Sequence, residues 1–301
     1  MINDKIDKEP TKNEDKAFTK EGVPHQSRDS APFICGFAAN MTNIIATFPL
    51  NKLMFRQQLY GVKTGVAMTQ IYREGASSLY RGLMPPLLQK SSSVALMFGL
   101  NNYFKSRLVG NYGMADNQAT VVSGMLAGTC EAFLTPFERV QTLLQHPKYI
   151  KSFSNTQKVF SKISGEYGVK ELYRGYTAIL YRNSLSTALF FTMKEPVKEL
   201  VKFQEQENKM MSAFSDFISG SAIGGFISTV FFPVNVVKTR MQSQIGGSYL
   251  SFTRTLVKVF NERNRSLRML YRGVHLNLIR SMVSWGIINT MYEVYLSMFK
   301  K

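Results

Sequence analysis

The sequence has few of the residues from which metal centres and disulfide frameworks are built. Its 301 residues include only two cysteines, Cys35 and Cys130, and three histidines. Two cysteines cannot form a disulfide framework or a four-thiolate zinc site, and both lie in apolar stretches, where we expect them to fill the core. His25, His146 and His275 are scattered between the N-terminal segment and the ends of apolar segments, so no metal cluster and no histidine-based triad is predicted. No cofactor and no metal are therefore expected.

Motifs that bind nucleotides in soluble enzymes are also missing. No Gly-x-Gly-x-x-Gly follows a strand-like segment and no Walker loop occurs, so the backbone cradle for a bound phosphate is lacking. Acidic residues are few, because 20 Asp+Glu face 37 Lys+Arg and leave a net charge of +17. Such a charge favours nucleic acid, an anionic membrane surface or a small anionic substrate as partner. Many basic residues recur at fixed positions of apolar repeats, which argues against nucleic acid.

Charge is absent from two long stretches, although the mean hydropathy of the chain is only −0.10. Residues 30–51 and 217–237 contain no charged side chain over 22 and 21 residues, and a helix of about 20 residues crosses a bilayer core. Residues 1–29 hold six Lys/Arg and seven Asp/Glu without an apolar run, which excludes a secretory signal peptide. We predict two membrane spans from length alone and a disordered tail over residues 1–30.

An internal repeat extends this prediction to the whole chain. Tyr-Arg-Gly occurs three times, beginning at Tyr80, Tyr173 and Tyr271 with spacings of 93 and 98 residues. A proline that closes an apolar run precedes each copy by 31, 37 or 38 residues. The three prolines are Pro49, Pro136 and Pro233. The chain therefore consists of three tandem repeats, which we place at residues 31–112, 113–208 and 209–301.

Each repeat predicts an apolar helix bent at the proline, a polar connection with a short amphipathic segment, and a second apolar helix. The six predicted membrane spans lie near residues 31–58, 84–107, 119–146, 178–201, 213–243 and 275–299. Glycines four residues apart, Gly124 with Gly128 and Gly220 with Gly224, predict close helix approach in lipid. In the first span Gly36 is followed by Asn40 at this spacing, which weakens the motif there.

Ionisable residues interrupt the spans at related depths. Lys90, Arg182 and Arg280 lie 8, 7 and 7 residues after the glycines of their repeats, and Glu131 lies five residues before Pro136. Ionisable residues in the middle of a membrane helix cost a few kcal/mol and normally face a polar pathway or a partner. One interpretation is that they only pair with one another to hold the helices together. Three cations against one acid leave an excess positive charge, which favours an anionic ligand.

Three repeats, each with a proline-marked odd helix and an aromatic-basic-glycine motif before the even helix, resemble the mitochondrial carrier family over residues 30–299. In each repeat, the family pattern Pro-x-acid-x-x-base lacks at least one of its two charged residues. It reads Pro49/Asn51/Met54, Pro136/Glu138/Gln141 and Pro233/Asn235/Lys238. Stretches such as FRQQLYG, LMPPLLQK, ERVQTLLQ and SWGIIN are similar to the NAD-carrying members of the family. This similarity implies NAD as the transported substrate.

The resemblance implies an all-α membrane protein with six transmembrane helices in three tandem repeats, which form a threefold pseudosymmetric barrel in the mitochondrial inner membrane. A single central site would open alternately to the intermembrane space and to the matrix, with both termini on the intermembrane-space side. The family's contact points fall on Gln89/Lys90, Arg182/Asn183 and Arg280/Ser281, and Glu131 falls on a substrate-facing position. Two guanidinium groups suit a pyrophosphate. For Glu131, contact with substrate and a bridge to Arg182 both remain open.

The resemblance also implies two gates. On the matrix side, positions two and five after each proline share a helix face, and only Glu138 with Lys238 can form an ion pair, whereas Asn51 with Gln141 can hydrogen-bond. On the opposite side Glu293 with Lys105 is the cross-repeat ion pair that the pattern permits. The matrix gate residues are Asn51, Glu138, Gln141, Asn235 and Lys238, and the cytoplasmic gate residues are Lys105, Glu195, Lys198 and Glu293. An alternative interpretation makes Glu138 and Glu293 ordinary charges at helix ends.

The Tyr-Arg-Gly motifs have two interpretations. They could be interfacial aromatic anchors, or, as the family implies, helix starts that bind cardiolipin phosphate. A monomer is expected. The alternatives for function are a carrier of another nucleotide or of a CoA-like anion on the same scaffold, and a non-transporting membrane protein that retains the fold.

Overall fold

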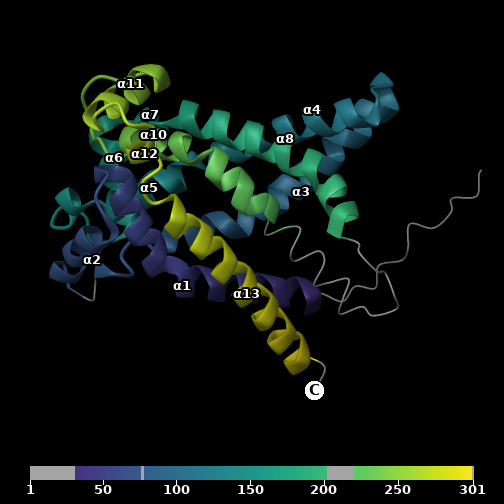
Figure 1. Cartoon of the computed structure of the whole chain (residues 1–301), viewed down its shortest axis with the longest axis horizontal. Coiled ribbons are helices and arrows are strands. Elements are labelled where there is room, and N and C mark those ends of the chain that lie inside the picture. The colour runs from purple at the N-terminus through teal and green to yellow at the C-terminus, as the bar shows by residue number, and fades with distance from the viewer. Residues whose placement is uncertain (1–30, 76–77, 202–219, 221, 300–301) are drawn as a thin grey trace, which may run out of the picture.

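The computed structural model describes residues 31–75, 78–201, 220 and 222–299, and the described part is helical (Figure 1). The predicted tail at residues 1–30 and the start of the fifth span lie outside the described residues. The long helices of the first two repeats are α1 (Ala31–Tyr60), α3 (Met84–Tyr112), α4 (Asp116–Glu131), α5 (Thr135–Gln145) and α8 (Tyr176–Val201). In the third repeat they are Ala222–Val230, α10 (Phe232–Gln242) and α13 (Val274–Phe299). Among the described residues, these helices lie at the ranges where the six long helices were predicted.

The prolines mark breaks in two of the three odd helices. A 3₁₀ turn, Ala132–Leu134, separates α4 from α5 immediately before Pro136. In the third repeat, Ala222–Val230 and α10 meet at an angle of 58° just before Pro233. The first repeat differs, because α1 continues through Pro49 as one helix. This bent pair in the third repeat is long and apolar enough to qualify as a membrane span by composition, and no single helix among the described residues qualifies.

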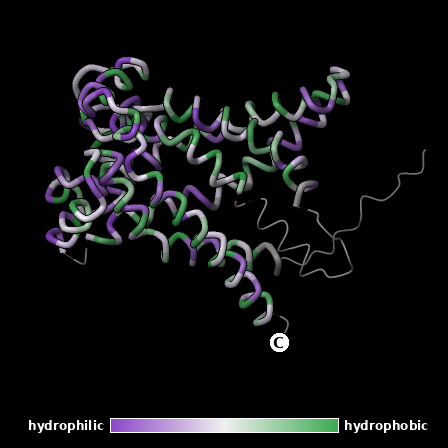
Figure 2. Tube along the Cα trace, in the orientation of Figure 1, coloured by the Kyte–Doolittle hydropathy of each residue, from purple (hydrophilic) through white to green (hydrophobic). Residues whose placement is uncertain are grey.

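Short helices connect the long ones. They are α2 (Thr64–Arg73), α6 (Thr156–Tyr167), α7 (Val169–Leu172), α11 (Phe252–Glu262) and α12 (Leu267–Leu270). The side chains of Asn155 and Ser251 cap α6 and α11 by accepting from backbone N–H groups in their first turns, which satisfies donors that a helix start leaves free. All of these helices gather at one end of the molecule, which we call the short-helix end (Figure 1). Hydrophilic residues are concentrated at this end (Figure 2).

The opposite end carries the start of α1 and the end of α13, and the long helices diverge toward it (Figure 1). We call it the terminal end. Here α3 extends beyond its predicted end at residue 107 to Tyr112, because Gly113, with φ of 59°, terminates the helix in the left-handed conformation that favours glycine. The core lies mainly at the short-helix end, where one cluster includes Val140, Leu143 and Ile163.

Close approach between helices follows the predicted glycine pairs in the second repeat. A Cβ at Gly124 would lie 2.7 Å from the Cα of Ala188, and a Cβ at Gly128 would overlap the backbone of Asn183. The α4 and α8 helices therefore pack backbone against backbone. The weaker motif in α1 has no such neighbour, because nothing lies within 4 Å of a Cβ at Gly36.

Candidate functional site

The predicted ion pair between the second and third repeats is present at the short-helix end. The ammonium of Lys238 on α10 donates to Oε2 of Glu138 on α5 at 2.9 Å. The other carboxylate oxygen, Oε1, accepts a hydrogen bond from Nε2 of Gln89 on α3 at 3.0 Å. The structure thus brings together a predicted substrate residue, Gln89, and two predicted gate residues.

The two predicted guanidinium groups lie on the even helices α8 and α13. Arg182 donates through Nη1 to the amide oxygen of its neighbour Asn183 at 3.0 Å. Arg280 donates through Nη2 to the amide oxygen of Asn277 at 3.2 Å, and its buried Nε has no partner. Both acceptors are neutral, so neither bond cancels the positive charge of its arginine. The charges of Arg182 and Arg280 act on each other and on Lys90.

Lys90 on α3 and Glu131 on α4 complete the predicted charged set. The Lys90 side chain is exposed, and Glu131 exerts the strongest attraction on its ammonium. Ser93, one turn after Lys90, donates a hydrogen bond to Oε1 of Glu131. Within the described residues Glu131 forms no ion pair with Arg182, so the bridge left open by the sequence is absent from this conformation. These three cations and one carboxylate are close enough to influence one another electrostatically, and together they carry a net positive charge.

The other two positions of the predicted matrix gate, one of which was expected to allow a hydrogen bond, are not joined. Among the described residues, no hydrogen bond links Asn51 with Gln141, although their side chains have the groups to form one, and none links Asn235 with Met54. Glu138 with Lys238 is accordingly the single ion pair at these positions of the repeat.

The terminal end shows the opposite arrangement. Lys105 on α3 donates to Asp116 at the start of α4 at 2.9 Å, within the described chain, instead of reaching Glu293. Glu293 on α13 is exposed. Glu195 and Lys198 belong to α8, but their side chains lie outside the described residues. The predicted gate pair is therefore formed at the short-helix end, between α5 and α10, whereas at the terminal end Lys105 pairs with the start of the next helix along the chain.

Two threonine–glutamine hydrogen bonds between repeats escaped the sequence analysis. Thr142 donates to Gln242 at 3.1 Å, and Thr239 donates to Gln58 at 3.0 Å. Each bond links the position six residues after one proline to the position nine residues after another, so the repeat spacing contained the signal. The third such pair would be Phe55 with Gln145, where the hydroxyl is missing and Nε2 of Gln145 is buried without a partner.

We expect Thr142→Val to destabilise the protein by about 1 kcal/mol, because buried Oε1 of Gln242 loses its donor. The apparent unfolding temperature of purified protein should fall by about 2 to 4 °C. Thr69→Val is the matched control, since Thr69 is exposed and bonds only to a carbonyl of its own helix. Equal changes in the two variants would contradict a role for the Thr142–Gln242 bond.

The arginines of Tyr-Arg-Gly also serve as links between repeats, which the sequence analysis did not foresee. Each donates to a backbone carbonyl in the last turn of the odd helix of the next repeat or in the loop that follows this helix. The bonds are Arg81 to Leu144 at 3.1 Å, Arg174 to Gly246 at 2.6 Å and Arg272 to Gly61 at 2.7 Å. At Gly175, with φ of +87°, a Cβ would lie 2.9 Å from the Gln242 side chain. The motif therefore requires glycine because neighbouring repeats pack against it.

A buried ion cluster fastens the second repeat to the third. Glu171 is 2% exposed and accepts from Nη2 of Arg139 at 3.0 Å, from the backbone N–H of Gly246 at 3.2 Å and from the hydroxyl of Tyr249 at 2.7 Å. The hydrogen bond to this carboxylate raises the pKa of Tyr249. Arg139 lies one residue after the gate carboxylate Glu138, so the cluster and the ion pair arise from adjacent residues of α5.

Repeat 3 is linked to repeat 1 by a buried arginine with a different set of partners. Arg263, after α11, donates to the carbonyl of Gln58 near the end of α1 at 2.6 Å and to the carbonyl of Met269 at 2.8 Å. Burial, together with the positive charges of Arg240 and Arg272, lowers its pKa to about 10. Arg263 therefore remains protonated near neutral pH.

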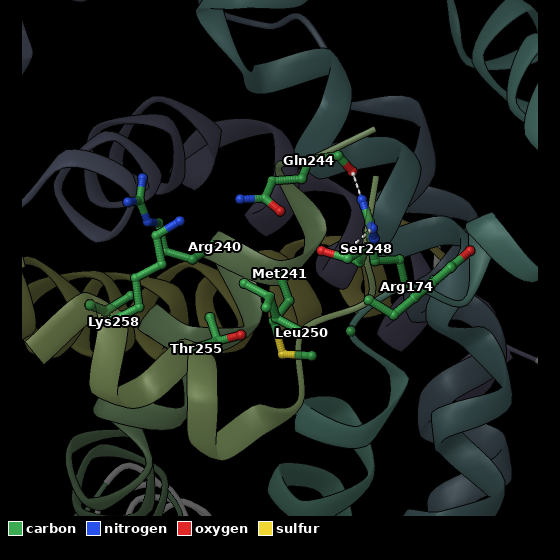
Figure 3. A pocket seen from close by; sticks show the side chains of 11 residues that line it. Arg174, Arg240, Met241, Gln244, Ser248, Leu250, Thr255 and Lys258 are labelled. Atoms are coloured by element: carbon green, nitrogen blue, oxygen red, sulfur yellow. Dashed lines mark hydrogen bonds between the residues drawn. The ribbon is translucent and has the colours of Figure 1, made fainter. Parts of the chain in front are cut away.

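A small pocket at the short-helix end is lined by the two residues before α8, the end of α10, the loop that follows it, and α11 (Figure 3). Its walls include Arg174, Arg240 and Lys258. Arg174 is directed at carbonyls of the loop after α10, as the dashed lines in Figure 3 show. None of the predicted substrate or gate residues lines this pocket, so it is separate from the charged set described above.

Comparison with known proteins agrees with the repeat structure. The family described as mitochondrial carrier protein matches residues 26–112, 115–205 and 209–301. A mitochondrial nicotinamide adenine dinucleotide transporter of Homo sapiens is 46% identical over 264 residues, which cover 88% of each chain. Its counterpart in Mus musculus is 44% identical over 269 residues, 89% of each chain. Solute carrier family 25 member 53 of Homo sapiens is 32% identical over 288 residues, 90% of this chain and 92% of the relative. With three matching repeats and these relatives along most of its length, the chain belongs to the mitochondrial carrier family.

Proposed function

We propose that this protein is a multi-pass carrier of the mitochondrial inner membrane that imports NAD into the matrix. The observation that carries the proposal is the 46% identity, over 88% of the chain, to a relative named as a mitochondrial nicotinamide adenine dinucleotide transporter. The charged set supports it, because NAD has an anionic pyrophosphate and a cationic nicotinamide ring. The substrate crosses the membrane unchanged, and the proposal includes no catalytic step.

In this proposal Arg182 and Arg280 bind the pyrophosphate. Guanidinium groups bind phosphate oxygens through paired charge-assisted hydrogen bonds, and both groups now donate only to neutral amides, which a phosphate can replace. Lys90 adds a point charge. We assign Asn183 and Glu131 to the ribose hydroxyls, and Glu131 also suits the cationic ring. Gln89, which the resemblance placed in this set, donates to Glu138 in the structure.

Alternating access would use the two ends of the molecule as gates. We assign the short-helix end to the matrix side. Lys238 and Glu138 are joined there, and Asn51, Gln141 and Asn235 occupy other gate positions of the repeat pattern. We assign the terminal end to the intermembrane-space side, with Lys105, Glu195, Lys198 and Glu293 as the gate. The structure then corresponds to the conformation closed toward the matrix.

The lipid and assembly proposals are independent of the substrate. We propose that the starts of α3, α8 and α13 bind cardiolipin through backbone N–H groups. The neighbouring Arg81, Arg174 and Arg272 already donate to carbonyls, so the backbone supplies the donors for the phosphate. We also propose that the carrier acts as a monomer without nucleic acid partners, since one chain contains all three repeats.

Uptake of labelled NAD into liposomes that contain the purified protein tests the function. We expect uptake that exceeds that of ADP, ATP and phosphate, and inhibition by unlabelled NAD stronger than by CoA. Uptake of ATP or CoA without uptake of NAD would assign the protein to another nucleotide on the same scaffold. No uptake of any of these by folded protein would favour a non-transporting role.

Single alanine substitutions test the charged set. Arg182→Ala, Lys90→Ala and Glu131→Ala should each reduce NAD affinity about thirtyfold, since a hydrogen bond to a charged group contributes on the order of 2 kcal/mol. Arg73→Ala is the control, because Arg73 is an exposed arginine at the end of α2. The measurement is the initial rate of uptake against NAD concentration, with folding checked by thermal unfolding. Near-normal uptake in two of the three variants would return these residues to a structural role.

A further inference from the structure

The Glu138 carboxylate joins all three repeats through side chains. It lies on α5 in the second repeat, accepts from Gln89 on α3 of the first repeat at 3.0 Å and from Lys238 on α10 of the third at 2.9 Å. The two donors use different oxygens, and Gln89 is itself 8% exposed. Since Glu138–Lys238 is the single ion pair at the gate positions, whatever orients this carboxylate controls the whole pair.

Gln89 also adjoins the charged set, because it directly precedes Lys90 on α3. Arg182 is, after Lys238, the charge that acts most strongly on Glu138. A phosphate that binds Lys90 and Arg182 therefore acts on the Glu138 carboxylate in two ways. It draws Lys90 and the adjoining turn of α3 toward itself, and it neutralises the charge that Arg182 presents to Glu138.

We infer that Gln89 is a positioning residue of the gate, which orients the Glu138 carboxylate toward Lys238 and releases it when substrate binds at Lys90. The inference rests on the proposed function and deepens it. The terminal torsion of a glutamate side chain is broad, so one ion pair alone leaves the carboxylate free to rotate. The amide of Gln89 holds Oε1, and Oε2 then faces Lys238. Substrate that moves α3 breaks this hydrogen bond and weakens the gate.

The contact is tested without substrate by a double-mutant cycle in thermal unfolding. Gln89→Met keeps the length of the side chain and removes the hydrogen bond. We expect it to lower the unfolding temperature of the purified protein by several degrees, and to have at most half of this effect in a Lys238→Met background. Gln118→Met is the matched control, since Gln118 is exposed on α4. Additive effects of Gln89→Met and Lys238→Met would overturn the inference, whether or not the protein carries NAD.

Transport kinetics test the release step. Gln89→Met should raise the NAD concentration for half-maximal uptake about tenfold without lowering the maximal rate, because a weaker gate depopulates the conformation that receives substrate. Gln89→Lys adds a second cation against Glu138 and should lower the maximal rate about tenfold without raising that concentration. A purely structural role would shift both parameters in the same direction for both variants.

Direct contact between Gln89 and NAD is the competing explanation. It predicts that Gln89→Met raises the half-maximal concentration by the same factor with Lys238 or with methionine at that position. The inference predicts a smaller factor in the Lys238→Met background. If Gln89→Met fails to fold, Gln89→Asn, whose amide is too short to reach Glu138, takes its place in the cycle. Absence of NAD uptake by the unaltered protein would refute the proposed function and leave the unfolding cycle as the test of the contact.

Discussion

Glu138→Lys is expected to reduce uptake at least tenfold, and Lys238→Glu in the same chain is expected to restore part of it. The single variant sets two cations against each other where Nζ of Lys238 now lies 2.9 Å from the carboxylate, with Arg182 adding further repulsion. The double variant rebuilds the ion pair in reverse. Gln89 tolerates the reversal, because an amide can accept a hydrogen bond as well as donate one.

This rescue requires the two side chains to meet across the second and third repeats, which only the tertiary structure brings about. Uptake should be compared at matched expression and matched unfolding temperature, with Arg73→Ala as the variant that removes an exposed charge. If the double variant transports no better than the worse single variant, either the pair does not form during transport or it has no part in gating. A matrix gate that is too weak shifts the population toward the conformation that is open to the matrix. Substrate binding then changes this population less.

Glu171→Gln is expected to have the largest effect on stability, a loss of about 3 to 5 kcal/mol. The substitution leaves Arg139, which is fully buried, without its carboxylate, and an unpaired charge in the interior is far more costly than a neutral gap. The apparent unfolding temperature should fall by about 10 °C. Glu166→Gln is the control, since Glu166 is exposed and pairs with Lys162 on the same helix at 3.9 Å, and should change stability by less than about 0.5 kcal/mol.

Removing both charges should be less harmful than removing one. Glu171 also pairs with Arg174 at 3.4 Å, but Arg174 keeps its hydrogen bonds to backbone carbonyls. Arg139→Gln combined with Glu171→Gln removes the fully buried cation that Glu171→Gln leaves unpaired, so the double variant should be more stable than Glu171→Gln alone. If Glu171→Gln and Glu166→Gln have equal unfolding temperatures, the buried cluster does not hold the second repeat to the third. Uptake measured on the same samples separates loss of folding from loss of transport.

The sequence predicted the features that depend on spacing along the chain. Tyr-Arg-Gly and proline recur at regular intervals, so the three repeats and the long helices near α1, α3 and α8 followed from periodicity. The pairing of Glu138 with Lys238 came from the family resemblance, which defines the gate positions, because these positions contain no other acid and base that can pair across repeats. Close approach of another helix to α4 followed from Gly124 and Gly128, since a residue without a side chain leaves room for a neighbouring backbone, and the structure showed that this neighbour is α8.

Other partners depended on directions in space that spacing does not contain. Lys105 was matched with Glu293 by the repeat pattern, yet the structure pairs it with Asp116, because the end of α3 and the start of α4 are adjacent while α13 diverges from them. Gln89 was grouped with Lys90, its neighbour in the sequence. Successive residues of a helix point about 100° apart, and the two side chains accordingly serve different partners.

By itself, then, the sequence determined the repeat, the placement of the helices, the excess of cations at one depth and the membership of the carrier family. Only the tertiary structure decided which donors reach Glu138, that Thr142 and Thr239 bond to glutamines of other repeats, and that the arginines of Tyr-Arg-Gly bond to carbonyls at or after the ends of the odd helices of the next repeat. The physical reason is that periodicity along a chain sets which face of a helix a side chain occupies. Hydrogen-bond partners are chosen among groups a few ångströms apart, and that proximity arises when the repeats close against one another.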